Sequence, residues 1–155
     1  MLRVRGAGEF AAGATGSGFW AGQAAGRMAL GFVTERFGER ISIVVYLVAS
    51  IALQLVFWLV PNFVVSAVAA SLVGFFIGPM FPGAINLTAK LLPKHIHVSA
   101  MGFAMALGGT GGTIFPFIIG AIAQAKGIWV LQPFVLGLFV VLAVTWFLYP
   151  RAPAR

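Results

Sequence analysis

The sequence contains no cysteine, and only 8% of its 155 residues are charged. Without cysteine the chain has no disulfide framework, no thiolate zinc site and no thiol nucleophile. Soluble domains carry about 25% charged residues, so a charged fraction this low excludes an ordinary water-facing surface. With only three acids in the chain and no nucleophile–base pair in its pattern, we do not expect an enzyme.

Apolar residues make up most of what is present. They account for 61% of the chain, and the mean hydropathy is +1.03. These values predict an integral membrane protein whose main partner is the lipid bilayer. The net charge of +7 would suggest nucleic acid in a soluble protein. Here the bases flank long apolar runs, so they predict membrane topology and no nucleic-acid partner.

The apolar runs predict an all-α fold, a polytopic membrane helix bundle with about five transmembrane helices. About 20 residues at 1.5 Å rise cross the ~30 Å hydrocarbon core, and one run of that length, 41–60, carries no charge at all. We expect residues 1–10 to be an irregular or non-native leader rather than a cleaved signal peptide, and residues 151–155 to be a basic cytoplasmic tail. The expected spans are 11–33, 41–60, 63–92, 98–124 and 131–149.

The distribution of bases predicts the orientation of the spans. Most bases fall in the turn at 36–40, the loop at 90–94 and the C-terminal tail, whereas the opposite loops hold only Lys126. The positive-inside rule therefore makes the crowded side, with the C-terminus, cytoplasmic. An odd number of spans then places Arg3 and Arg5 outside, where they fit poorly. Either the leader is not native or further chain precedes it.

One charged turn separates the first two apolar runs. The segment from Gly22 to Arg40 has glycines at helical spacing, followed by acids and bases close together. Glycines at 22, 26 and 31 would let a neighbouring helix approach closely. Gly38 offers the turn a backbone that adopts positive φ. We expect Arg27 to lie near enough to the helix end to extend toward the headgroups.

Glycine and proline mark two further helices. Pro79 and Pro82, three residues apart within the third run, each remove a helix donor and should bend or break the helix. Such breaks survive at membrane depth where protein or a watery cavity pairs the freed carbonyls. The fourth run holds Gly108, Gly112 and Pro116, which favour close helix packing with local flexibility. Its Gly-Gly-Thr-Gly-Gly segment lacks the lysine and the preceding strand of a phosphate loop.

The two histidines of the chain, His95 and His97, share one loop. Their spacing suits a metal pair, but no third ligand stands nearby in the sequence. We interpret them as a solvated loop beside the headgroups and predict no metal site and no cofactor.

The segment Gly31-Phe-Val-Thr-Glu35-Arg36-Phe-Gly38-Glu39-Arg40 resembles the signature loop of the major facilitator superfamily, Gly-x-x-x-Asp-Arg-x-Gly-Arg-Arg/Lys. Glu35 replaces the family's aspartate, and Glu39 replaces an arginine. In that family the loop lies between the second and third helices and recurs, weaker, between the eighth and ninth. The following order also fits the family's C-terminal half, with a Gly/Pro-rich helix, a basic loop and a glycine-rich helix. The loop after Leu92 looks most like the fungal members.

The resemblance covers about residues 17–150, which would be helices eight to twelve of twelve. It implies transport of a small solute by alternating access, with Gly31, Glu35, Arg36, Gly38 and Arg40 in a gating loop. Glu35 would face the start of the helix near His97 as a cytoplasmic latch, or these charges only fix topology. Polar and aromatic residues of the helices are candidates to line a substrate cavity: Trp20, Gln23, Phe81, Asn86, Thr110 and Thr113.

Five helices cannot enclose a central site alone, so the missing N-terminal helices or another half-bundle are expected partners. The leading interpretation is the C-terminal part of a transporter in the plasma membrane or an internal membrane such as the vacuole. A truncated fragment that transports nothing, a partner-dependent half-transporter and a homo-oligomer that rebuilds the pathway remain alternatives. The substrate is not readable from the sequence, because this architecture carries many solutes.

Overall fold

The computed structural model describes residues 9–148, and side chains within 13–148 except that of Ile128. Most of the expected leader and the whole of the expected tail lie outside these residues. Across the described range the chain is helical, without a β-strand. The expectation of an all-helical membrane protein is confirmed. The elements are α2 (Glu9–Phe37), α3 (Glu39–Leu59), α4 (Phe63–Ile77), α5 (Met80–Leu91), η1 (Lys94–Ile96), α6 (His97–Lys126), η2 (Ile128–Val130) and α7 (Leu131–Leu148).

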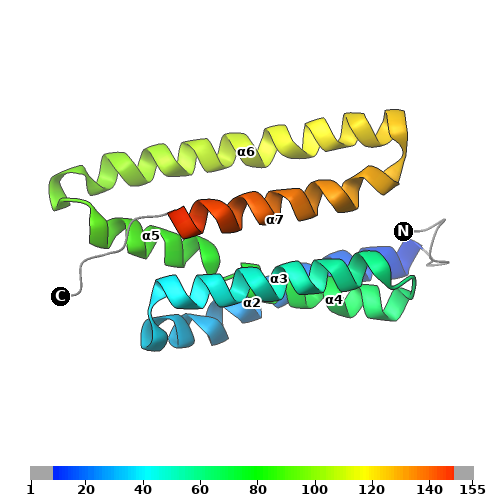
Figure 1. The fold of residues 1–155 in the computed structure, drawn as a ribbon, viewed down its shortest axis with the longest axis horizontal. Coiled ribbons are helices and arrows are strands. Elements are labelled where there is room, and N and C mark those ends of the chain that lie inside the picture. The colour runs from blue at the N-terminus through cyan, green and yellow to red at the C-terminus, as the bar shows by residue number, and fades with distance from the viewer. Residues whose placement is uncertain (1–8, 149–155) are drawn as a thin grey trace.

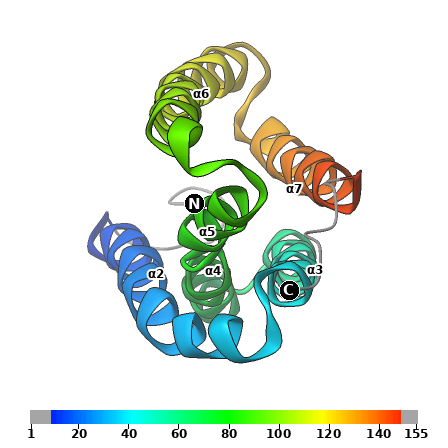
Figure 2. The same ribbon diagram turned by 90° about the vertical axis from the view of Figure 1, so that its left-hand side faces the viewer.

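The helices run roughly side by side along the long axis of the molecule (Figure 1). Viewed end-on, α4 lies between α2 and α3, and α7 lies beside α3 (Figure 2). The helix α6 stands apart from this group, and its main contacts are with α7 and with the short turns η1 and η2 at its ends. The described chain is therefore a packed group of helices with one helix held mainly through its two ends.

Four helical segments are long and apolar enough to cross a membrane: Glu39–Leu59, Phe63–Leu91, Lys94–Lys126 and Leu131–Leu148. The sequence predicts five such spans, so the first helix marks a difference. At 29 residues α2 is long enough, but its glycine, polar and charged residues lower its hydropathy. Its place in the bundle comes from close packing against α4 rather than from an apolar surface.

The third apolar run divides into α4 and α5 at Gly78 and Pro79. Asn62 is the N-cap of α4. Its side-chain oxygen accepts hydrogen bonds from the backbone N–H of Val64, at 2.9 Å, and of Val65, which satisfies unpaired helix donors. Because proline has no N–H, the carbonyls one turn before Pro79 and Pro82 lack their helical donors. The break therefore leaves backbone oxygens that other groups must pair.

A small apolar core lies where α3, α5 and α7 meet. Its buried members are Ile43, Tyr46, Leu47, Met80, Leu87 and Trp146. By contrast, none of the residues of α6 is buried within the part of the chain that the structure describes. The stability of the described bundle therefore rests on α2, α3, α4, α5 and α7, and α6 adds little to it.

The closest approach of two helices is between α2 and α4. A Cβ atom added at Gly22 or Gly26 would overlap the backbone oxygens of Ser71 and Phe75, respectively. On the other helix, a Cβ at Gly74 would overlap the backbone oxygen of Phe19. At these positions the helices pack backbone to backbone, which only glycine permits.

Candidate functional site

The charged turn between α2 and α3 consists of a single residue, Gly38. Its φ of 89° and ψ of 143° fall in a region that essentially only glycine populates. Its N–H donates to Thr34 O at 3.0 Å, and its own carbonyl accepts from Ser42 N at 3.2 Å. Gly38 thus reverses the chain in one residue and fixes where the charges on either side of it lie.

Three ends of the chain's elements come together near this turn. The turn itself, the end of α5 with η1, and the end of α7 lie at the same end of the molecule (Figure 1). The expected base-rich side, apart from the tail that lies outside the described residues, therefore forms one face of the bundle. Its orientation relative to the cytoplasm stays a prediction.

The acid that forms an ion pair at this face is Glu39. Its carboxylate accepts from Lys90 Nζ, which joins the start of α3 to the end of α5. The Glu39 side chain is 13% exposed and the Lys90 side chain 58% exposed, so the carboxylate is largely withdrawn from water. Glu35 and Arg36 are exposed, and no ion pair joins either of them to another described residue. The resemblance singles out Glu35, whereas the structure shows a partner for Glu39.

Arg40 connects the start of α3 to the end of α7. Its Nη2 donates to Phe147 O at 3.4 Å, and Trp146 Nε1 donates back to Arg40 O at 3.3 Å. The Nη1 of Arg40 is buried without a hydrogen-bond partner among the described residues. Arg40 therefore links the start of α3 to a backbone carbonyl at the end of α7, and its role in a gating loop stays a prediction.

A buried hydroxyl network joins α2 to α3 below the turn. Thr34 Oγ1 donates to Leu30 O at 2.8 Å, Tyr46 Oη donates to the same carbonyl at 3.2 Å, and the two hydroxyl oxygens are 3.1 Å apart. Both side chains are buried. Sequence reasoning missed this pair, since a threonine and a tyrosine 12 positions apart have no local pattern that links them.

We expect Tyr46→Phe to lower the free energy of unfolding by about 1 kcal/mol, because it removes one interhelical hydrogen bond and keeps the ring in the core. Thermal or denaturant unfolding in detergent measures the change. Thr145→Val is the matched control, because that hydroxyl is exposed and bonds only its own helix, at Val141 O. Equal stability of the Tyr46 variant and wild type would mean that the Tyr46 hydroxyl does not contribute to the free energy of unfolding.

A second polar contact joins α3 to α7 farther along the helices. Gln54 Nε2 donates to Gln132 Oε1 at 2.7 Å, and Gln54 is buried. Amide pairs of this kind hold membrane helices together where no water competes. The sequence shows two isolated glutamines in apolar runs, and only the fold brings them together.

The break between α4 and α5 is paired by α2. Arg27 Nε donates to Gly78 O at 3.3 Å, and this carbonyl is the one whose helical donor Pro82 removes. Arg27 is expected to extend toward the headgroups, but the structure directs its Nε to this break instead. The backbone of Gly26 lies against Phe75 O, the carbonyl left without a donor by Pro79.

The six residues predicted to line a substrate cavity are spread over three helices. Trp20 and Gln23 lie on α2, exposed and half-buried, respectively. Phe81 and Asn86 are exposed on α5, and Thr110 and Thr113 are exposed on α6, where each hydroxyl donates to a carbonyl of its own helix. These side chains come from three different helices, and their role in lining a cavity stays a prediction.

The remaining predicted packing glycines face open space. A Cβ at Gly31, Gly108 or Gly112 meets no neighbouring atom within 4 Å in the described part of the chain. Pro116 lies inside α6, which continues through it. Close packing at Gly31 is not seen among the described helices, and packing at Gly108 and Gly112 remains a prediction about helices outside them.

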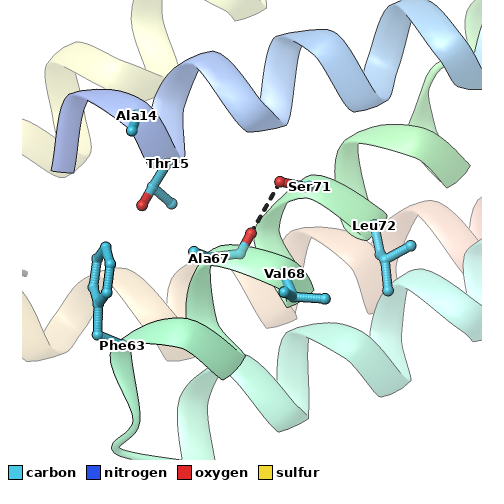
Figure 3. Close-up of a pocket in the computed structure, with 7 residues that line it drawn as sticks. All are labelled: Ala14, Thr15, Phe63, Ala67, Val68, Ser71 and Leu72. Carbon is cyan, nitrogen blue, oxygen red and sulfur yellow. Dashed lines mark hydrogen bonds between the residues drawn. The ribbon is translucent and has the colours of Figure 1, made fainter. Parts of the chain in front are cut away.

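An apolar groove lies between the first half of α2 and the start of α4, away from the charged turn (Figure 3). Its volume is about 490 Å³, and Ala14, Thr15, Phe63, Ala67, Val68, Ser71 and Leu72 line it. Ser71 Oγ donates to Ala67 O at 3.0 Å, as Figure 3 shows. With no charged lining residue, the groove suits an apolar side chain or an acyl chain rather than a polar solute.

No group of three metal-ligating side chains gathers anywhere within residues 9–148. His97 Nε2 lies 2.7 Å from Leu92 O, a contact that holds the end of α5 against the start of α6. The ring contact that the structure describes for these two histidines is therefore the contact of His97 with a backbone carbonyl.

Comparison with known proteins adds two findings. The model of the family described as Major Facilitator Superfamily matches residues 1–155. The chain is also 35% identical over 161 residues to "Bypass of stop codon protein 6" of Saccharomyces cerevisiae. This alignment covers 97% of the chain and 32% of the yeast protein. The chain thus spans about a third of the length of the curated relative it matches.

Proposed function

Since this chain belongs to the major facilitator superfamily, we propose that it forms part of a carrier that moves a small solute across a membrane by alternating access. In such carriers two helical bodies rock about a site near the middle of the bilayer and expose it to each side in turn. The described helices would supply a portion of one body. The membrane is the plasma membrane or an internal membrane such as the vacuole.

The observation that carries this proposal is the position of α6. This helix is 30 residues long, and none of its described residues is buried. It touches its neighbours mainly at its two ends, and its middle carries small and hydroxyl residues that suit contact with further helices. The position of α6 supports the proposal that a second set of helices packs against it. These helices would come from the rest of a longer polypeptide or from another half-bundle.

The charged turn would act at the cytoplasmic side of this carrier. Glu39 and Arg40 are already engaged with α5 and α7, which holds the start of α3 in place. Glu35 and Arg36 are exposed beside them, so these two side chains are available for a further contact when the cytoplasmic side closes. A carboxylate near a helix N-terminus is favoured by the helix dipole, and Glu35 would use the start of α6 near His97 as the partner of a latch.

We expect Glu35→Gln to leave membrane insertion and unfolding unchanged and to slow solute uptake about tenfold, because the latch loses one charge-assisted contact. Uptake into liposomes that contain the complete gene product measures the effect. Lys94→Gln is the control, since it removes an exposed charge at the same face. Wild-type uptake by the Glu35 variant would mean that these charges only fix the membrane topology.

The alternative function is a membrane fragment that transports nothing by itself. The single feature that favours it is the length relative to the yeast protein, of which the alignment covers 32%. Uptake by the 155-residue chain and by the complete gene product, measured in parallel liposomes, separates the two proposals. The carrier proposal expects saturable uptake with the complete product and none with the 155-residue chain alone.

A further inference from the structure

Arg27 lies beside the middle of a membrane-length helical segment. Along α2 it is about 15 Å from the helix end at Phe37, at 1.5 Å per residue. Its partner Gly78 lies near the middle of the membrane-length segment Phe63–Leu91. A charged side chain at such a depth is expensive and commonly marks a solute or ion pathway.

The hydrogen bond to Gly78 uses only part of the Arg27 side chain. A guanidinium has five N–H donors in a planar fork, and the structure engages the single Nε–H with the carbonyl left open by Pro82. Arg27 is exposed, and its two Nη groups make no hydrogen bond among the described residues. The bond to Gly78 fixes the plane of the fork and leaves its outer edge available to a second acceptor.

No carboxylate of the described bundle compensates this charge. The three acids of the chain, Glu9, Glu35 and Glu39, stand at the start or end of α2 and α3. The ion pair formed among the described residues is Glu39 with Lys90. The charge of Arg27, beside the middle of the segment Phe63–Leu91, is therefore left to pair with an anion from outside these helices.

The surroundings of Arg27 on α2 indicate what kind of anion fits. Trp20, Gln23 and Arg27 are spaced i, i+3 and i+7, so they share one face of the helix. Trp20 is 67% exposed and presents an indole to that side, while Gln23 is half-buried and adds an amide. A planar apolar ring stacks on indole, and an oxyanion accepts the paired donors of a guanidinium.

We propose that Arg27, Gln23 and Trp20 bind a small aromatic or apolar monoanion, and that an anion of this class is the transported solute. This inference rests on the proposed carrier function, since the wall opposite α2 would come from the second helical body. Arg27 contacts the oxyanion, Gln23 donates or accepts one hydrogen bond, and Trp20 contacts the ring.

The test uses the complete gene product in detergent with a charged and a neutral ligand of the same shape, benzenesulfonate and benzenesulfonamide. We expect benzenesulfonate at saturation to raise Tm by about 3 °C and benzenesulfonamide to leave it unchanged. Arg27→Gln should abolish the rise, and Arg27→Lys, which keeps a charge but loses the fork, should weaken binding about tenfold. Lys94→Gln should keep the wild-type rise.

Each variant is compared with its own unliganded Tm, so a loss of the Gly78 contact alone does not imitate loss of the anion site. An unchanged rise in Arg27→Gln, an equal rise with the neutral ligand, or no rise in wild type would each overturn the proposal. If Arg27→Gln does not fold, the Lys variant decides, and undiminished affinity there overturns it as well. Benzenesulfonate binding without uptake would refute the carrier function and keep the site. If the protein takes up glucose, Arg27→Lys leaves that uptake unchanged and benzenesulfonate does not bind, the anion site would be refuted and the carrier function kept.

Discussion

Replacing Gly26 with leucine is expected to lower the free energy of unfolding by about 3 kcal/mol or more, which is enough to prevent assembly of a marginally stable bundle. A Cβ at this position would overlap Phe75 O and lie 2.9 Å from Phe75 Cα. These are backbone atoms, so no side-chain rotation relieves the overlap and α2 must move away from α4. The movement would also separate Arg27 from Gly78.

Unfolding in detergent measures this change, with Gly16→Leu as the matched control on the same helix. A Cβ at Gly16 meets no atom within 4 Å among the described residues, and leucine is a better helix former than glycine by several tenths of a kcal/mol. The control should therefore be neutral or slightly stabilising. Equal stability of the two variants would mean that the α2–α4 contact is looser than the structure shows.

Gly38→Ala is expected to cost about 2 kcal/mol and to reduce uptake about tenfold or more, because alanine does not tolerate a φ of 89° with a ψ of 143°. Space is not the reason, since a Cβ there meets no described atom within 4 Å. The turn would relax to another backbone conformation and rotate the start of α3. Glu39 would then move from Lys90, and Arg40 from Phe147.

Gly137→Ala is the control for this variant, since Gly137 is a helical glycine of α7 with open space around it. It should keep full uptake and gain up to about 1 kcal/mol of helix stability. If Gly38→Ala retained wild-type stability and uptake, the one-residue turn would not be what positions the charged side chains.

The fold class and the family could be predicted from the sequence. Long uncharged runs are typical of membrane spans, and the match of the family model over residues 1–155 confirms the resemblance seen in the charged turn. The proline pair likewise signals a break wherever it occurs in a helix. These features are local or compositional, so a single sequence displays them without any knowledge of which helices are neighbours.

The partners of the side chains were less predictable, because they depend on which helices lie side by side. The lysine that pairs with Glu39 is 51 positions away, and nothing in the loop indicates that Glu39 rather than Glu35 is paired. Gln54 and Gln132 are 78 positions apart. Arg27 is expected near the headgroups because the sequence shows its distance from the end of the helix. The sequence does not show that the carbonyl of Gly78, which lacks a helical donor, lies beside it.

The central claim is that these helices belong to a carrier that needs a second helical body. Saturable uptake tests it most directly, with the complete gene product and the 155-residue chain in separate liposomes and radiolabelled glucose, alanine and benzenesulfonate as solutes. We predict saturable uptake of at least one solute, the anion foremost, by the complete product, with no uptake by the 155-residue chain. Absence of saturable uptake of all three by a complete product that unfolds cooperatively, or uptake by the 155-residue chain in monomeric form, would contradict this claim.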